Sequence, residues 1–265
     1  TRLELLDTLT IGALSGFEVG DGHLMAAEVE LAAGNLAGAV AHSEALARLP
    51  FYRGEDHIAT CRRLFIDALA GHFDDVVHNG ETFRVGWERA GRPVARNLGR
   101  GAYAVAMVHG ILGDEDRRAA WVRLTIDLGF DPEELNSCLV GFQPVFDGLL
   151  ALHRGDPAGA ARLLAIDIDA PELFQIVGAG PWRPWYTALW VEAAVLGRLD
   201  NAAQRIERSR RAVRDNPIAT AMVDRAAAIA AGDRDALARL VVTFAQLGCP
   251  YQQARTARIT AGPLV

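Results

Sequence analysis

The side chains that most often carry out chemistry form no recognisable motif in this chain of 265 residues. Seven histidines are present, but no two of them stand four residues apart beside a glutamate, as the helix of a zinc protease requires. His72 and His78 flank two aspartates in the segment HFDDVVH, and a polar helix start explains this cluster better than a metal site. The serines lack the G-x-S-x-G turn of a hydrolase. The sequence therefore predicts a protein that is not an enzyme and that holds no metal and no cofactor.

Acidic pairs and an arginine-rich run are the remaining candidates for chemistry. Asp74 with Asp75, and the acidic run 114–116, stand where the second helix of a helix pair is expected to begin. Negative charge stabilises a helix N-terminus, so a capping role is favoured over acid and base catalysis. The run RIERSRRAVR at 205–214 could form a phosphate-binding patch, but the sequence favours a solvated helix face.

Composition and charge exclude several classes of protein. All 27 basic residues are arginines, which excludes the P-loop and Schiff-base chemistry that depend on lysine. The formal net charge of −6 argues against direct contact with nucleic acid. Cys61, Cys138 and Cys249 stand far apart, as is typical of a reducing compartment, and no apolar run reaches the roughly 18 residues of a membrane span. We expect a cytoplasmic protein without membrane contact, and because it starts at Thr1 we expect a piece of a longer chain.

Helices must position whatever site exists, because apolar residues recur at three- and four-residue spacing along most of the chain. At six places, 35 to 42 residues apart, a glycine ends an apolar helix and a few turn residues lead to the next one. The residue just past a helix end often adopts the left-handed conformation, which favours glycine. These glycines are Gly34, Gly71, Gly113, Gly155, Gly197 and Gly232. The residues predicted to cap the following helices are Asn35, Asp114, Asp156 and Asp233.

This pattern predicts an all-α fold, namely a right-handed superhelix (α-solenoid) in a single domain over residues 1–265. Its period is close to that of tetratricopeptide repeats, although Leu64, Trp190 and Arg225 stand where the repeat expects a small residue. The stretch 166–184 contains three prolines and two glycines and is predicted as a loop. A partial helix is expected at each end. About six helix hairpins are predicted, at 21–49, 55–90, 94–129, 141–166, 182–214 and 217–248.

The first helix of each hairpin should line the concave side of such a superhelix. Counting back from each glycine gives a largely apolar lining with arginines at its edge, and the segment PWRPWYTALW adds a cluster of aromatic rings. Two alternatives stay open: a groove that binds a ligand or a peptide, and a core in which these side chains pack on one another. The candidate groove residues are Cys61, Phe65, Arg100, Tyr103, Met107, Phe142, Val145, Leu149, Trp182, Trp185, Tyr186 and Met222.

The segment GCPYQQARTARITAG at 248–262 resembles an element of large actinobacterial regulators of the LuxR type, which carry an ATPase module in front and a helix-turn-helix behind. The resemblance covers about fifteen residues near the end of a tetratricopeptide-like region in that family. It implies that the chain is the sensor region of such a regulator. It further implies that an inducer or inhibitory partner shifts an inactive monomer toward a nucleotide-bound oligomer. The matching residues are Gly248, Pro250, Tyr251, Ala254, Arg255, Thr256 and Gly262.

Two functions follow as hypotheses. The first is a non-catalytic sensor domain of a transcriptional regulator, which binds a small-molecule inducer or a peptide or protein partner in the apolar groove. The second is a stand-alone scaffold that holds a protein partner and senses nothing. An enzyme would require Tyr103, His109 and the arginines to converge in a deep pocket.

Overall fold

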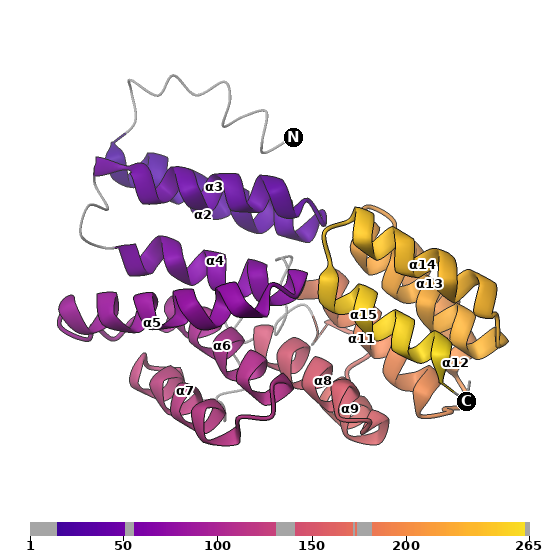
Figure 1. Ribbon diagram of the computed structural model, residues 1–265. Helices are drawn as coiled ribbons and strands as arrows, with labels where there is room; N and C mark the ends of the chain where they lie inside the picture. Colours follow the sequence, from indigo (N-terminus) through magenta and orange to yellow (C-terminus); the bar gives the residue numbers. More distant parts are fainter. Residues whose placement is uncertain (1–14, 51–55, 131–140, 172, 174–181, 263–265) are drawn as a thin grey trace.

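The computed structural model describes residues 15–50, 56–130, 141–171, 173 and 182–262 (Figure 1). These residues form α-helices and one 3₁₀ turn, η3 (Arg96–Leu98), and they contain no β-strand. The expectation of an all-α chain is therefore confirmed. The α-helices are α2 (Gly16–Ala32), α3 (Leu36–Arg48), α4 (Asp56–Ala70), α5 (Phe73–Arg89), α6 (Gly99–Ile111), α7 (Glu115–Asp127), α8 (Phe142–His153), α9 (Pro157–Leu163), α11 (Trp182–Leu196), α12 (Ala202–Val213), α13 (Pro217–Ala231), α14 (Arg234–Gln246) and α15 (Pro250–Ala261).

Helices that follow one another in the sequence pack against each other. The contacts join α2 to α3, α4 to α5, α6 to α7, α8 to α9, α11 to α12 and α13 to α14. The first helices of these pairs also touch, since α6 lies between α4 and α8, and α8 packs on α11. Helices α6 and α11 are buried around nearly their whole circumference, whereas α12 buries only Ile206, Ser209 and Val213. A helix that is apolar on every side belongs in the interior, and the sequences of α6 and α11 have that character.

The glycines at the joins have the predicted backbone conformation at five of the six positions. Gly34, Gly71, Gly113, Gly155 and Gly232 have φ between 68° and 94°, in the left-handed region. At the fifth join the prediction was wrong, because the left-handed residue is Arg198, with φ of 52°, and not Gly197. The Arg198 N–H donates to the carbonyl oxygen of Val195. The turn that ends α11 is therefore centred one residue after Gly197.

The four predicted N-caps are all formed. In each case the side-chain oxygen accepts a hydrogen bond from the backbone N–H three residues further on, at 2.7–3.1 Å. These bonds satisfy donors that a helix N-terminus leaves unpaired. The capping residues are Asn35, Asp114, Asp156 and Asp233.

The predicted loop at 166–184 is shorter than expected at its C-terminal end. Helix α11 already begins at Trp182, so Pro184 lies in its first turn, where the missing N–H of a proline costs no hydrogen bond. The described part of the loop, residues 164–170, leaves α9 and runs beside α11 and α12. Residues 171 and 173 are helical instead of loop, and the rest of the predicted loop lies outside the described residues, as do Cys138 and the expected N-terminal partial helix. The other partial helix is α15, which has 12 residues.

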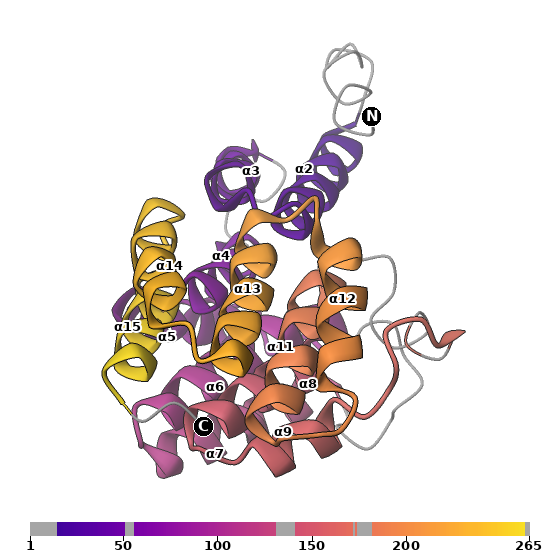
Figure 2. The same ribbon diagram turned by 90° about the vertical axis from the view of Figure 1, so that its right-hand side faces the viewer.

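The C-terminal helices return to the N-terminal part of the chain. Helix α15 contacts α4, and α11 contacts α2 (Figures 1 and 2). The rings of Phe73 and Tyr251 lie 5.1 Å apart between centroids, and the Asn216 side-chain amide donates to the Ala32 carbonyl oxygen at 2.9 Å. Gly71 is required at this junction, because a Cβ added there would lie 2.3 Å from the Cβ of Tyr251. The chain thus brings its first and last described helices into one packed body.

Among the described residues, no helix is both long and apolar enough to cross a membrane.

Candidate functional site

The residues predicted to line a groove lie in the interior of the molecule. Apart from Arg100, every one of them belongs to a single cluster of buried side chains, and none of these is more than 5% exposed. The buried candidates are Cys61, Phe65, Tyr103, Met107, Phe142, Val145, Leu149, Trp182, Trp185, Tyr186 and Met222. A ligand that used these side chains would first have to separate the helices that carry them.

Aromatic rings fill the space between α4, α6, α8 and α11. The Trp182 ring lies 5.4 Å from Phe65, 6.1 Å from Phe142 and 5.6 Å from Phe146, between centroids. Tyr103 joins the same group, at 5.7 Å from Phe142. Such tilted and edge-on pairs contribute about 0.5–1.5 kcal/mol each beyond the area they bury. This arrangement is what the alternative of a packed core expects.

Arg100 is held at the edge of this aromatic interior. Its guanidinium forms an ion pair with Glu28 of α2 and lies 5.6 Å from the centroid of the Phe65 ring. Only 12% of the Arg100 side chain is exposed. Its charge is therefore already matched within the chain, instead of being offered to a carboxylate or phosphate from outside.

A buried group of charges joins α11, α13 and α15, and the sequence did not reveal it. Glu192 is fully buried and contacts Arg225 at 2.8 Å and Arg255 at 2.7 Å, each through a different carboxylate oxygen. A second Arg225 nitrogen donates to the side-chain oxygens of Gln252 and Thr256, at 2.8 and 3.1 Å. Burial by itself would raise the pKa of Glu192, but the two guanidiniums outweigh it and hold that pKa below its usual range. We call these five residues the charge network.

Signals for the charge network were present in the sequence. Arg225 stands where the repeat expects a small residue, and Arg255 and Thr256 belong to the C-terminal element. Their partner Glu192 stands in the apolar run of α11 and gave no periodic signal. A buried charge needs an opposite charge, so one arginine in an apolar helix implies an acid on a neighbouring helix.

Tyr103 and His109 lie on different sides of α6. The Tyr103 hydroxyl donates to the Asp147 carboxylate at 2.7 Å, and Arg118 lies 3.6 Å from the same carboxylate. His109 stands six residues further along α6, which places it about 120° around the helix from Tyr103. In the described part of the chain, no group of three or more His, Cys, Asp and Glu side chains could hold a metal ion.

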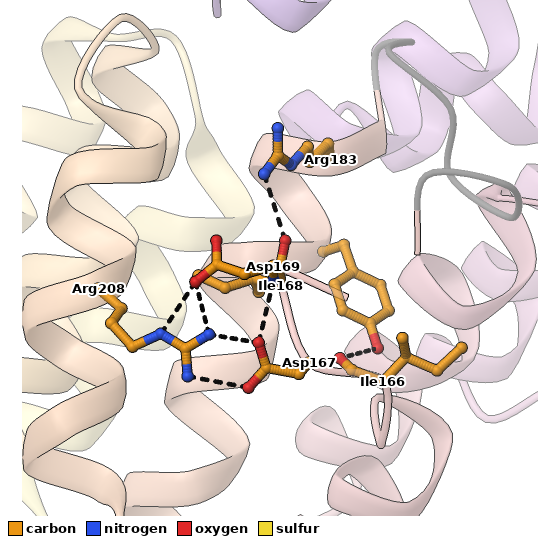
Figure 3. Close-up of polar contacts among 7 residues, drawn as sticks. Ile166, Asp167, Ile168, Asp169, Arg183 and Arg208 are labelled. Atoms are coloured by element: carbon orange, nitrogen blue, oxygen red, sulfur yellow. Dashed lines mark hydrogen bonds and ion pairs between the residues drawn. The ribbon is translucent and has the colours of Figure 1, made fainter. Parts of the chain in front are cut away.

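An exposed cluster of acids and arginines ties the loop at 164–170 to α12 (Figure 3). Arg208 binds both carboxylate oxygens of Asp167, one of them at 2.9 Å, and it donates to Asp169 at 2.6 and 3.1 Å. Arg183 of α11 donates to the carbonyl oxygen of Ile168 at 3.2 Å. The arginine run at 205–214 is thus largely matched by acids, since Arg210 also contacts Asp224 at 3.6 Å.

Three hollows lie between neighbouring helices at the surface of the described residues. Two adjoining hollows of 310 and 350 Å³ lie between α5 and α7, with Trp121 and Leu124 among their lining residues and Arg84 at the boundary that they share. A third hollow of 380 Å³ lies between α12, α13 and α14 and is lined by four alanines, four charged residues and Leu240. Tryptophan and arginine are the residue types that most often anchor protein partners.

Alkaline pH is expected to destabilise the chain, because burial raises the pKa of Tyr103, Tyr186 and Tyr251. Burial also raises the pKa of Cys249, to about 12. Below about pH 8 these groups are neutral in both states, and the stability that depends on them is complete. As the pH rises through about 10, the unfolded chain ionises while the folded chain resists, so the free energy of unfolding falls.

Urea unfolding at about pH 8 and about pH 10.5 measures this loss as a lower midpoint. The urea midpoint of Tyr186→Phe should fall less between the two pH values than that of the parent chain, because the variant has one buried hydroxyl fewer to ionise. Equal midpoints at the two pH values in the parent chain would contradict the prediction.

Comparison of the chain with protein-family models, with curated proteins and with solved structures finds no match.

Proposed function

We propose that this chain is a non-catalytic helical-repeat domain that binds a protein or peptide partner, as the sensor region of a LuxR-type transcriptional regulator. The observation that carries the proposal is the place of the C-terminal element in the fold. Arg255 and Thr256 from that element meet Glu192 and Arg225 in the charge network, and Tyr251 packs on Phe73. Three of the seven residues that carry the resemblance, Tyr251, Arg255 and Thr256, therefore help to attach the last helix to the rest of the domain.

The proposal includes the finer architecture, a right-handed superhelix of about six helix hairpins. It is supported by the packing of consecutive helices in pairs and by the contacts that run from α4 to α6, from α6 to α8 and from α8 to α11. Contacts between successive first helices are typical of a stacked array of helix pairs. The return of α15 to α4 would make this superhelix tightly wound.

A protein or peptide partner is favoured over a compact inducer by the state of the interior. The apolar side chains that would have received a small molecule pack on one another, and the hollows between helices lie at the surface. Small-molecule sites usually enclose most of their ligand, whereas partner sites are shallow and combine an apolar centre with polar edges.

Thermal unfolding in the presence of sugars, fatty acids and short peptides tests the proposal. We expect peptides to raise the melting temperature, because a ligand at about 100 times its Kd stabilises the native state by about 2.7 kcal/mol. A rise with a sugar or a fatty acid alone would contradict the choice of partner, and no rise with any compound would contradict the binding role.

A chimeric regulator separates the sensor from the stand-alone scaffold. This chain would replace the helical region of a LuxR-type regulator that controls a reporter gene. A sensor should make the reporter respond to the same peptide that raises the melting temperature. A scaffold would bind the peptide in the thermal assay and leave the reporter unchanged.

A further inference from the structure

The guanidinium of Arg208 already forms hydrogen bonds with two acids of the same chain, Asp167 and Asp169. The Arg208 side chain is 23% exposed, while those of Asp167 and Asp169 are 46% and 66% exposed. The two carboxylates lie beside the guanidinium (Figure 3), and they are more exposed to solvent than it is. An arginine that binds both oxygens of a carboxylate holds that carboxylate in a defined orientation.

A rigid aromatic platform supports this arginine. Trp190 is 1% exposed, and the Cζ atoms of Arg205 and Arg208 lie 4.1 and 5.5 Å from the centroid of its ring. Arg205 also donates to the Trp190 carbonyl oxygen at 3.3 Å, and its buried Nε has no hydrogen-bond partner. Two guanidiniums close to one tryptophan ring create a positive site on α12.

The loop that supplies the acids is also held by contacts that do not involve them. The Tyr186 hydroxyl donates to the carbonyl oxygen of Ile166 at 3.0 Å, and Arg183 donates to that of Ile168. These main-chain contacts fix the loop at the level of its backbone. The Asp167 and Asp169 side chains can therefore leave Arg208 without release of the whole loop, and exposed ion pairs contribute little to stability.

We propose that Arg208 and Arg205, stacked on Trp190, form a binding site for an acidic segment of a protein partner, and that Asp167 and Asp169 occupy this site as an internal competitor. This inference rests on the proposed partner-binding function and names the chemistry of one contact. The partner supplies paired carboxylates in place of the loop. The neighbouring Arg210 is matched by Glu207 and Asp224, so its charge is not offered to the partner.

The test uses a labelled peptide with the sequence of residues 164–171 of this chain, which contains both aspartates. Fluorescence anisotropy measures its binding to the full chain and to the variant Asp167→Asn/Asp169→Asn. We expect the variant to bind the peptide at least about tenfold more tightly than the parent chain, because its internal competitor is neutral. Binding should weaken as salt rises from about 50 to about 300 mM.

Matched variants identify the site. Adding Arg208→Gln to the double variant should abolish binding, whereas adding Arg211→Gln, which removes an exposed arginine of the same helix, should leave it unchanged. A peptide with asparagine at both aspartate positions should not bind. Circular dichroism establishes that each variant retains the helical fold.

Equal peptide affinity for the parent chain and the double variant would overturn the proposal, and so would equal losses from Arg208→Gln and Arg211→Gln. Either result would leave the partner-binding function standing wherever another peptide raises the melting temperature. Failure of every peptide in that thermal assay would instead contradict the function itself.

Discussion

Glu192→Ala is expected to lower the free energy of unfolding by about 3–5 kcal/mol, because it leaves two buried arginines without their counter-charge. Arg225 and Arg255 both contact Glu192, at 2.8 and 2.7 Å, and both are buried in the folded chain. A buried unpaired cation loses its hydration and gains nothing in return. The change should appear as a lower midpoint in urea unfolding followed by tryptophan fluorescence.

Two control variants separate charge from volume. Glu192→Gln retains the size of the side chain but removes its charge, so it should also be strongly destabilising. Glu207→Ala removes an exposed glutamate of α12, and it should change the free energy of unfolding by less than about 1 kcal/mol. If Glu192→Gln matched the parent chain in stability, the assignment of Glu192 as the counter-charge would be wrong.

Replacement of the whole set of charges gives a further contrast. Glu192→Leu combined with Arg225→Met and Arg255→Met removes all three charges together. Hydrophobic residues of similar volume often replace a buried ion group at little or no cost. We expect the triple variant to be more stable than Glu192→Ala, although Gln252 and Thr256 lose the Arg225 donor.

Phe142→Ala should destabilise the chain by about 3–5 kcal/mol, as is usual when a buried aromatic side chain is removed from a core. Phe142 is 1% exposed, and its ring lies 5.7 Å from Tyr103 and 6.1 Å from Trp182. The variant loses these contacts and leaves a cavity between α6, α8 and α11. Urea unfolding at neutral pH measures the loss.

The stability of Phe142→Ala also decides whether the candidate groove residues form an open groove or a packed core. Phe142→Leu, which conserves most of the volume, should cost less than about 1.5 kcal/mol. Val94→Ala, at a residue that is 76% exposed, should change the stability very little. A small effect of Phe142→Ala would mean that the ring belongs to an open groove and not to a core.

Local features of the fold were predictable from the sequence because their causes are local. The caps at Asn35 and Asp233 require only a short polar side chain before a helix, and the turn at Gly113 only a residue that tolerates positive φ. The error at Gly197 is also local, since the residue with the left-handed conformation is its neighbour Arg198.

Long-range features could not be predicted in this way. Periodicity identified an apolar face on the helix that carries Phe65 and another on the helix that carries Tyr103. It could not show that these two faces pack against each other. Phe65 meets Trp182 across more than a hundred residues of sequence, at 5.4 Å between centroids. The pairing of Asp167 with Arg208 likewise depends on the path of a loop, for which no periodic pattern exists.

The contact of Asn216 with Ala32 joins residues 184 positions apart, and it has a consequence for biosynthesis. A ribosome adds about 5–20 residues each second, so Asn216 is synthesised on the order of 9 to 37 s after Ala32. Until α11, α13 and α15 are each made, the early helices expose the surfaces that these helices later cover. The nascent chain therefore passes through a period in which a chaperone, or a neighbouring copy, can occupy those surfaces.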